Sequence, residues 1–505
     1  MESGPEEPSP LRSRWLDAFA GDRYRLTRRF FQRGLALVYG IAFLVAANQF
    51  VPLLGEHGIL PVPRFVAAVP FSASPSLFFL APRDWAFTAA AWLGLALSLV
   101  ALSGLSEKRG WLLSALTWGS LWVLYLSFVN VGQIFYGFGW ETMLLEAGFF
   151  AIFLGSERTV PSGIVVVLYR WMLFRTMFGA GLIKLRGDSC WRDLTCLYYH
   201  YETQPMPNPL SWYFHWLPRP FHKLEVLFNH FTEIVVPFAY FAPQPFASIA
   251  GLLTIFFHLW LMASGNFSFL GLLTMVLAIP TIDDRMLRRL LRIRTAPDAP
   301  LPSRRAHRWA TVALAVLVGV LSIGPALNLV SPHQAMNTSY DPLHLVNSYG
   351  AFGSITRPRY EVVVLGTSSD TIDARTPWRE YAFKAKPGDP RRAPPQIAPY
   401  HLRLDWLMWF CGFTPWYQEP WFANFMAKLL QNDPRTLSLI AGNPFPEKPP
   451  RHVRALLYEY RFTTPEERRR TGAWWVRELK DEYFPIVSLD DADFRGLLER
   501  EGWIP

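Results

Sequence analysis

The chain has 505 residues, of which 51% are hydrophobic and only 18% are charged. Because a water-soluble protein of this length usually carries about 25% charged residues, the composition argues against an entirely soluble protein and favours one with many membrane spans. The net charge of +9 is concentrated in arginine clusters beside apolar segments, a placement typical of membrane topology and not of nucleic-acid binding, so no nucleic-acid partner is expected.

Hydropathy divides the chain into three parts. Residues 1–33 form a basic tail, residues 34–330 hold nearly all long apolar stretches, and residues 331–505 are polar and rich in proline. A helix needs about 20 apolar residues to cross a bilayer. The candidate spans are 34–54, 85–105, 111–131, 140–155, 163–184, 226–242, 246–264, 266–281 and 309–330. We therefore predict a polytopic α-helical membrane domain of about nine spans, followed by a C-terminal domain.

The arginine clusters predict the orientation in the membrane. The first cluster comprises Arg12, Arg14, Arg23, Arg25, Arg28, Arg29 and Arg33, and the second fills the linker from Arg285 to Arg308. Short cytoplasmic segments are enriched in Lys and Arg, and eight spans between the clusters would return the second to the side of the first. The N-terminus is thus expected in the cytoplasm. The loop 185–225 and the domain 331–505 are expected on the extracytoplasmic side.

A dense polar block follows the fifth predicted span, in "GLIKLRGDSCWRDLTCLYYHYETQP" from Gly181 to Pro205. Lys184 lies where this span meets water. Its side chain can simply extend to the interface. Alternatively it can be desolvated and act as a base, oriented by Asp188, His200 and Glu202, so that Lys184, His200 and Glu202 are the candidate catalytic residues. The sequence leaves both interpretations open.

The same loop contains Cys190 and Cys196, which lie on the oxidising side of the membrane and are compatible with a disulfide. Their spacing differs from the Cys-x-x-Cys of thiol oxidoreductases. Cys411 has no obvious partner, and no Cys/His spacing of the zinc type occurs, so no metal site is predicted.

Ionisable residues inside the predicted spans are costly and usually face the protein interior. They are Glu141, Glu146, Arg170, Arg175, Glu225, Glu233 and His258. With a rise of about 1.5 Å per residue, Glu146 lies ~8 Å and Arg175 ~13 Å below the outer surface on consecutive antiparallel spans. We predict an ion pair between these two residues. The alternative is a polar cavity open to the outside.

The C-terminal domain is expected to be α+β with a small β-sandwich-like core. Strands are predicted at 360–366 and 378–386, a proline-rich loop at 387–399 and an amphipathic helix at 400–413. Short helices are predicted at 420–430, 434–441, 450–460 and 465–480. The motifs of common hydrolases, nucleotide-binding proteins and metalloproteases are missing, so no cofactor is expected.

Several long blocks resemble the lipase maturation factor family, among them "GWETMLLEAGFFAIFLG" and "NSYGAFGSITRPRYEVVVLGTS". The resemblance implies a chaperone-like, multi-pass protein of the endoplasmic reticulum membrane that helps secreted lipases reach an active fold through its C-terminal domain. The bias toward Arg, Ala and Pro indicates a bacterial relative, which would lie in the cytoplasmic membrane. The implied client-binding residues are Tyr349, Phe352, Arg359, Tyr360, Trp378, Tyr381, Asp389, Arg391, Tyr400, Arg403, Asp405 and Trp406.

A weaker resemblance links "GLIKL" and its Trp-bearing loop to vitamin K-dependent γ-glutamyl carboxylase, in which a lysine at a comparable place is the catalytic base. That resemblance would make Lys184 the base of an intramembrane enzyme, with Glu146 and Arg175 lining a cavity for a lipid-like or quinone-like cofactor. We expect a maturation factor without catalysis, whose partners are the bilayer and a secreted lipase-like client. The carboxylase-like enzyme remains the alternative.

Overall fold

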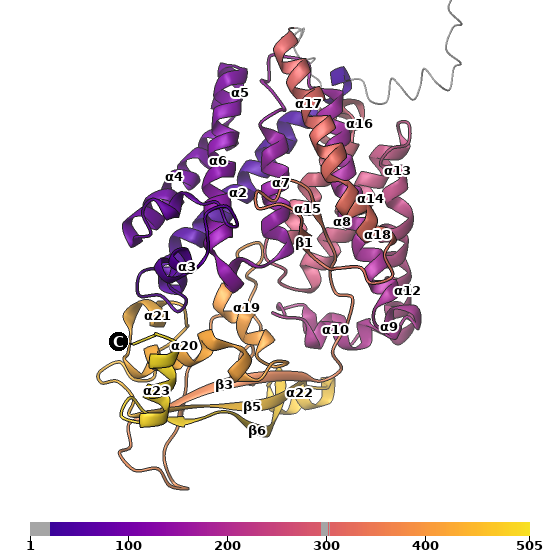
Figure 1. Cartoon of the computed structure of the whole chain (residues 1–505). Coiled ribbons are helices and arrows are strands. Elements are labelled where there is room, and N and C mark those ends of the chain that lie inside the picture. The colour runs from indigo at the N-terminus through magenta and orange to yellow at the C-terminus, as the bar shows by residue number, and fades with distance from the viewer. Residues whose placement is uncertain (1–20, 294–300, 302–303, 505) are drawn as a thin grey trace, which may run out of the picture.

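The structure is a computed structural model that describes residues 21–293, 301 and 304–504. Arg12 and Arg14 of the predicted basic tail lie outside the described residues. A bundle of helices forms one part of the molecule, and a small sheet domain packs against one end of it (Figure 1). The arrangement agrees with the predicted order of a membrane domain followed by a C-terminal α+β domain.

Among the described residues, six helical segments are long and apolar enough to cross a membrane. The first is Gly21–Leu54, which contains α2 (Arg25–Leu54). The next four are the helices α4 (Asp84–Ser103), α6 (Trp111–Val131), α8 (Gly163–Arg186) and α14 (Phe246–Ser264). The last is Arg305–Val330, which contains α17 (Arg305–Leu321) and α18 (Ile323–Val330). Because α2 starts at Arg25, four of the arginines predicted to lie in a tail belong to its first turns: Arg25, Arg28, Arg29 and Arg33. The protein is a multi-pass membrane protein.

The other three predicted spans are shorter or interrupted. They correspond to α7 (Gly139–Ala151), to α12 (Arg219–His230) continued by a π-helical turn (Phe231–Val235) and α13 (Val236–Ala239), and to α15 (Leu270–Ala278). Pro237 lacks an N–H group, which explains the irregular turn before it. Nearly every residue of α7 is buried by neighbouring helices, so this helix needs no full span of its own.

Exposed apolar side chains mark the perimeter of the bundle. Trp92 and Leu99 on α4, and Val316 and Val320 on α17, are each more than half exposed. Large apolar side chains at such exposure are unfavourable in water but match the hydrocarbon of a bilayer. These faces are therefore the lipid-facing surface.

Short helices connect the spans. They are α3 (Val62–Ala68), α5 (Leu105–Arg109), α9 (Ser189–Arg192), α10 (Leu197–Thr203), α11 (Ser211–His215) and α16 (Asp284–Leu291), with 3₁₀ turns at Gly21–Tyr24, Leu77–Phe79, Gln133–Tyr136, Ile279–Thr281 and Trp416–Gln418. Gly104 adopts φ 75° at the end of α4. This left-handed conformation, which favours glycine, turns the chain sharply into α5.

The C-terminal domain is built on a four-stranded antiparallel sheet in the order β4-β3-β5-β6. Its strands are β3 (Arg359–Thr367), β4 (Arg379–Glu380), β5 (His452–Phe462) and β6 (Trp475–Val487). The valines of β3 are buried, as expected for β-branched residues in a central strand. The remaining helices are α19 (Arg403–Phe410), α20 (Pro420–Leu430), α21 (Pro434–Ser438), α22 (Pro465–Thr471) and α23 (Ala492–Arg500).

The structure corrects four predictions about this domain. Residues 450–460, predicted as a helix, belong to β5, and residues 465–480 form the short helix α22 and the start of β6. The strand predicted at 378–386 is reduced to Arg379–Glu380. The sandwich-like core is not formed within the described residues: apart from a two-stranded sheet of β1 (Thr338–Ser339) and β2 (Asn347–Ser348), there is one sheet, and α19 and α20 pack against it.

Candidate functional site

A cavity of about 1200 Å³ lies where the helical bundle meets the C-terminal domain. Its walls come from α8, α10, α12, α14 and α19 and from the segments 332–337 and 349–354. The lining side chains are mostly apolar and aromatic, with a few polar groups among them. Lys184, His200 and His258 lie on this lining together with Glu225 and Glu233. The cavity thus brings together five residues that the sequence singled out.

Lys184 is buried and fully paired. Its Nζ lies 2.6 and 2.7 Å from the two carboxylate oxygens of Glu233, and donates to Asn229 Oδ1 at 3.0 Å. The ammonium also faces the ring of Trp191. Its three donors are therefore occupied, and it does not extend to water as one interpretation expected. The predicted neighbours Asp188 and Glu202 do not contact it; Glu233 and Asn229 hold it instead.

Two histidines face the cavity from different elements. His200 on α10 stacks on Phe267 and meets Phe352 edge-on, and burial, with the Lys184 ammonium nearby, lowers the pKa of His200 to about 3. His258 on α14 places Nδ1 3.0 Å from the carbonyl oxygen of Thr254. Since a carbonyl only accepts, Nδ1 carries the proton and Nε2 is an acceptor in the neutral ring.

Glu202 joins α10 to the sheet. Its carboxylate accepts the backbone N–H of Phe462 on β5 at 2.6 Å, and His215 lies 3.9 Å from it. Burial raises the pKa of Glu202 to about 7, although the hydrogen bond from Phe462 opposes the shift. This residue therefore serves the contact between the loop and the C-terminal domain, and lies apart from Lys184.

The pKa of Glu202 predicts a pH effect on stability. Between about 4.5 and 7 the folded state holds a proton that the unfolded state has lost, so this carboxyl group makes the free energy of unfolding fall as pH rises through that window. Glu202→Gln keeps an acceptor for Phe462 and removes the charge. We expect it to raise stability above pH 7 by about 1–3 kcal/mol, with little change near pH 4.5. Thermal unfolding across this pH range measures the difference; equal shifts at both ends would contradict it.

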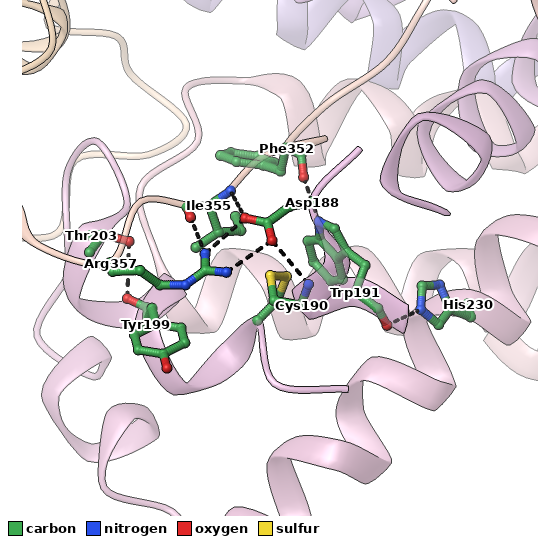
Figure 2. Close-up of a disulfide and its surroundings, with 10 residues drawn as sticks. Asp188, Cys190, Trp191, Tyr199, Thr203, His230, Phe352, Ile355 and Arg357 are labelled. Atoms are coloured by element: carbon green, nitrogen blue, oxygen red, sulfur yellow. Dashed lines mark hydrogen bonds and ion pairs between the residues drawn. A yellow bond between two sulfur atoms is a disulfide. The ribbon is translucent and has the colours of Figure 1, made fainter. Parts of the chain in front are cut away.

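The loop after α8 is held by a disulfide and an ion pair (Figure 2). Cys190 and Cys196, whose shared loop was compatible with a disulfide, form one. Asp188 caps α9 through the N–H of Cys190 and pairs with Arg357 at 2.8 Å, and this arginine keeps the pKa of Asp188 well below its usual range. The indole of Trp191 donates to the carbonyl of Phe352. These contacts tie the loop to residues 352–357 of the C-terminal part.

The predicted pair of Glu146 and Arg175 is present and buried. Glu146 also accepts hydrogen bonds from the Asn347 backbone N–H at 3.1 Å and from the Tyr349 hydroxyl at 2.7 Å. The pair is thus covered by the segment that enters the C-terminal domain, and it does not line the cavity. The alternative of a polar cavity around these two residues is wrong.

Two further intramembrane charges bind groups distant in sequence. Glu141 pairs with Arg403 of α19 at 2.8 Å, and both side chains are fully buried. The Arg403 guanidinium also lies 3.4 Å from the centre of the Tyr136 ring. Arg170 donates to the Tyr24 hydroxyl at 2.6 Å and to the carbonyl of Pro280 at 3.0 Å. These charges fasten helices and domains together inside the molecule.

The comparison with known families covers most of the chain. Residues 26–289 match the lipase maturation factor transmembrane domain, and residues 345–485 match the lipase maturation factor C-terminal domain. The chain belongs to the lipase maturation factor family. The boundary between the two matched regions agrees with the division into a helical bundle and a sheet domain.

Individual relatives support the membership over the full length. The chain is 43% identical to lipase maturation factor 1 of Homo sapiens over 95% of this chain and 90% of that protein, and 42% identical to lipase maturation factor 1 of Bos taurus over 99% and 95%. It is 30% identical to lipase maturation factor 2 of Homo sapiens over 95% and 85%. No solved structure matches.

The structure shows where this lipase maturation factor places the residues of its family blocks. Arg359 is buried in an ion pair with Glu361, and Glu361 also pairs with Lys386 at 2.9 Å. The Arg359 guanidinium donates to the carbonyls of Glu202, Gln204 and Pro205. Asp405 accepts the N–H groups of Ala385 and Lys386. These charged residues hold the sheet, α19 and the α10 loop together.

The remaining candidates divide by exposure. Tyr349, Tyr381 and Trp406 are buried, and Tyr349, Phe352 and Trp406 line the cavity. Tyr360 and Trp378 are partly buried, and the Tyr400 hydroxyl accepts from Gln49 Nε2 on α2 at 3.1 Å. Asp389 and Arg391 are exposed in the proline-rich loop, and are the members of the set that solvent and a partner can reach.

Sequence reasoning missed several contributors to this site. Asn229 contacts Lys184, and Arg357 pairs with Asp188. Nothing in the sequence around either residue marks it: Asn229 is an ordinary amide on a helix, and Arg357 is a surface arginine. Glu361 directly precedes the three valines 362–364 of a predicted strand, and a charge next to this apolar run was the signal that could have identified it. Among the described residues, no group of His, Cys, Asp and Glu could hold a metal ion.

Proposed function

We propose that this protein is a membrane-anchored maturation factor for secreted lipases. The observation that carries the proposal is the match of both family domains, with 43% identity to a lipase maturation factor over 95% of the chain. Maturation here means assistance with folding or assembly of the client, through binding and without a chemical step. The lipid bilayer is the other partner.

The sheet domain acts, in this proposal, on the extracytoplasmic side. The basic helices α5 and α16 and the start of α17 lie at the end of the bundle opposite the sheet (Figure 1). Arg29 and Arg33, at the start of α2, pair with Glu157 at that same end. The enrichment of Lys and Arg in cytoplasmic segments supports a cytoplasmic position for this end. The membrane is that of the endoplasmic reticulum, by family, or the cytoplasmic membrane of a bacterium.

The exposed part of the sheet domain is the proposed client-binding surface. Asp389 and Arg391 present charges in an exposed loop, and the same domain exposes Phe413 and Tyr417 at 41% and 68%. A partly folded chain offers both apolar segments and unpaired polar groups, so a mixed surface of this kind suits it.

The test is a rescue experiment in cells that lack their own maturation factor. The wild-type chain is expected to restore secretion of active lipase. Asp389→Ala with Arg391→Ala is expected to lower the yield about tenfold or more at unchanged membrane abundance, since a few central contacts carry most binding energy. The matched control is Glu466→Ala with Arg469→Ala, an exposed ion pair on α22, which should change little.

Two outcomes would contradict these proposals separately. If the wild-type chain restores no active lipase although it reaches the membrane, the proposed function is wrong. If the wild type restores activity and the Asp389 and Arg391 variant does so equally well, the client binds elsewhere on the domain.

The contacts of Lys184 disfavour the carboxylase-like alternative. A base must accept a proton, whereas the Lys184 ammonium already donates to both oxygens of Glu233 and to Asn229. The family match names maturation factors and points to no enzyme.

A further inference from the structure

The size and walls of the cavity suit one large apolar molecule. Small-molecule pockets usually measure about 300–1,000 Å³, and this cavity measures about 1200 Å³. Met143, Met177, Phe257, Leu261 and Phe267 are among its apolar walls. Most of the lining surface is apolar, so few polar groups are available to hold water. An apolar occupant would instead make dispersion contacts with the wall atoms.

The cavity also reaches the lipid-facing perimeter of the bundle. Leu224 on α12 and Phe256 on α14 line the cavity and are 60% and 54% exposed. Neighbouring residues on the same helices, such as Phe231, Phe246 and Leu259, are similarly exposed and apolar. The lining of the cavity is therefore continuous with exposed apolar side chains on α12 and α14, of the kind that match the hydrocarbon of a bilayer.

Polar acceptors are present inside this apolar space. His200 and His258 line the cavity and are only 5% and 6% exposed. With Nδ1 of His258 donating to Thr254, its Nε2 is an acceptor that binds no other described residue. Neither ring nitrogen of His200 has a hydrogen-bond partner among the described residues. Buried polar groups normally have partners, so a ligand that donates a hydrogen bond would satisfy these rings.

The one lysine among the described residues of the lining is paired inside the cavity. Lys184 is neutralised by Glu233 and uses all its donors. Arg186 keeps its charge, but it is exposed at the rim, where it donates to Gln334 and to the carbonyl of Leu329. A phosphate that moved past this rim would lose contact with a free cation, and burying an unpaired charge is costly. An uncharged polar end fits the lining, and an anionic one does not.

We propose that this cavity binds a neutral lipid whose polar end carries a hydroxyl group, with the acyl chains along the apolar walls and the hydroxyl donating to His258 or His200. The lipid enters from the bilayer between α12 and α14. This binding site is independent of client binding by the exposed loop of the sheet domain.

The test uses the full chain, purified and placed in phosphatidylcholine nanodiscs, with a diacylglycerol that carries a diazirine in one acyl chain. After illumination, cross-links are expected on peptides from α12, α14 and residues 349–354. Unlabelled diacylglycerol should compete. Its acetate ester, which lacks the hydroxyl, and phosphatidic acid with the same chains should compete about three- to tenfold less well, the effect of one lost hydrogen bond or one unpaired charge.

Variants connect the cross-links to the cavity. Ala180 lies on the lining, and Ala180→Trp should fill part of the space and lower labelling about tenfold. Ala96→Trp, a matched change on the exposed side of α4, should leave labelling unchanged. His258→Phe keeps the ring and removes the acceptor, and should abolish the preference for diacylglycerol over its acetate ester or reduce it severalfold.

Three results would overturn the proposal. They are cross-links outside the cavity only, labelling that is insensitive to both Ala180→Trp and His258→Phe, and competition by phosphatidic acid that equals or exceeds that by diacylglycerol. If Ala180→Trp fails to fold, the competition series and His258→Phe decide. Because labelling is read directly, the outcome does not depend on lipase maturation.

Discussion

Arg403→Met is expected to destabilise the protein by about 3–5 kcal/mol, because it leaves the carboxylate of Glu141 buried without its partner. The two side chains are 0% exposed and 2.8 Å apart, and they join α19 of the C-terminal domain to α7 of the bundle. The same change also removes the contact between the guanidinium and the Tyr136 ring. The expected result is a lower unfolding temperature in detergent and faster proteolysis at the junction of the two domains.

The double variant Arg403→Met with Glu141→Gln separates the ion pair from general packing. A neutral pair of similar volume removes the unpaired charge, so at least half of the lost stability should return. Arg391→Met is the matched control, since Arg391 is exposed and its loss should cost less than about 0.5 kcal/mol. If the Arg403→Met variant unfolds at the same temperature as the wild type, the junction of the two domains does not depend on this pair.

Lys184→Met is also expected to cause a large loss of stability. It leaves the Glu233 carboxylate, which is 4% exposed, with Asn229 as its remaining partner. The expected loss of stability is again about 3–5 kcal/mol, visible as reduced membrane abundance and a lower unfolding temperature. Lys184→Met with Glu233→Gln should recover much of it.

This pair of variants also distinguishes structure from chemistry at Lys184. If the lysine is structural, the double variant should restore secretion of active lipase in proportion to its abundance. If the lysine acts as a base, the double variant should remain inactive at normal abundance. Arg186→Met, two residues after Lys184 and exposed, serves as the control for removing a charge at this end of α8.

The membrane part of the fold was predictable because hydrophobic length is a local property. The long spans follow from runs of apolar residues, and the pair of Glu146 and Arg175 followed from their similar depth on consecutive helices. The partner of Lys184 was not predictable in this way. Glu233 lies 49 residues further along the chain, and the irregular helix before Pro237 brings it to Lys184, so only tertiary packing determines the pair.

The C-terminal domain was less predictable for a related reason. Residues 450–460 were predicted as a helix, yet residues 452–462 pair with β3 on one side and β6 on the other. Sheet pairing overrides local preference when partners on both sides are available. Likewise, Arg359 and Asp405 were chosen as client-binding residues from a resemblance, which identifies family blocks but says nothing about burial.

The bonds between the two domains have a mechanical consequence. Asn347 and Tyr349 donate to Glu146 within the bundle, and Arg403 pairs with Glu141 there, so the C-terminal domain is anchored to the bundle at several separated points. In the proposed function, a secreted chain that binds this domain is therefore held at a fixed height and angle above the lipid surface. Substitutions deep in the membrane, far from any client, would tilt that platform and change which clients it can receive.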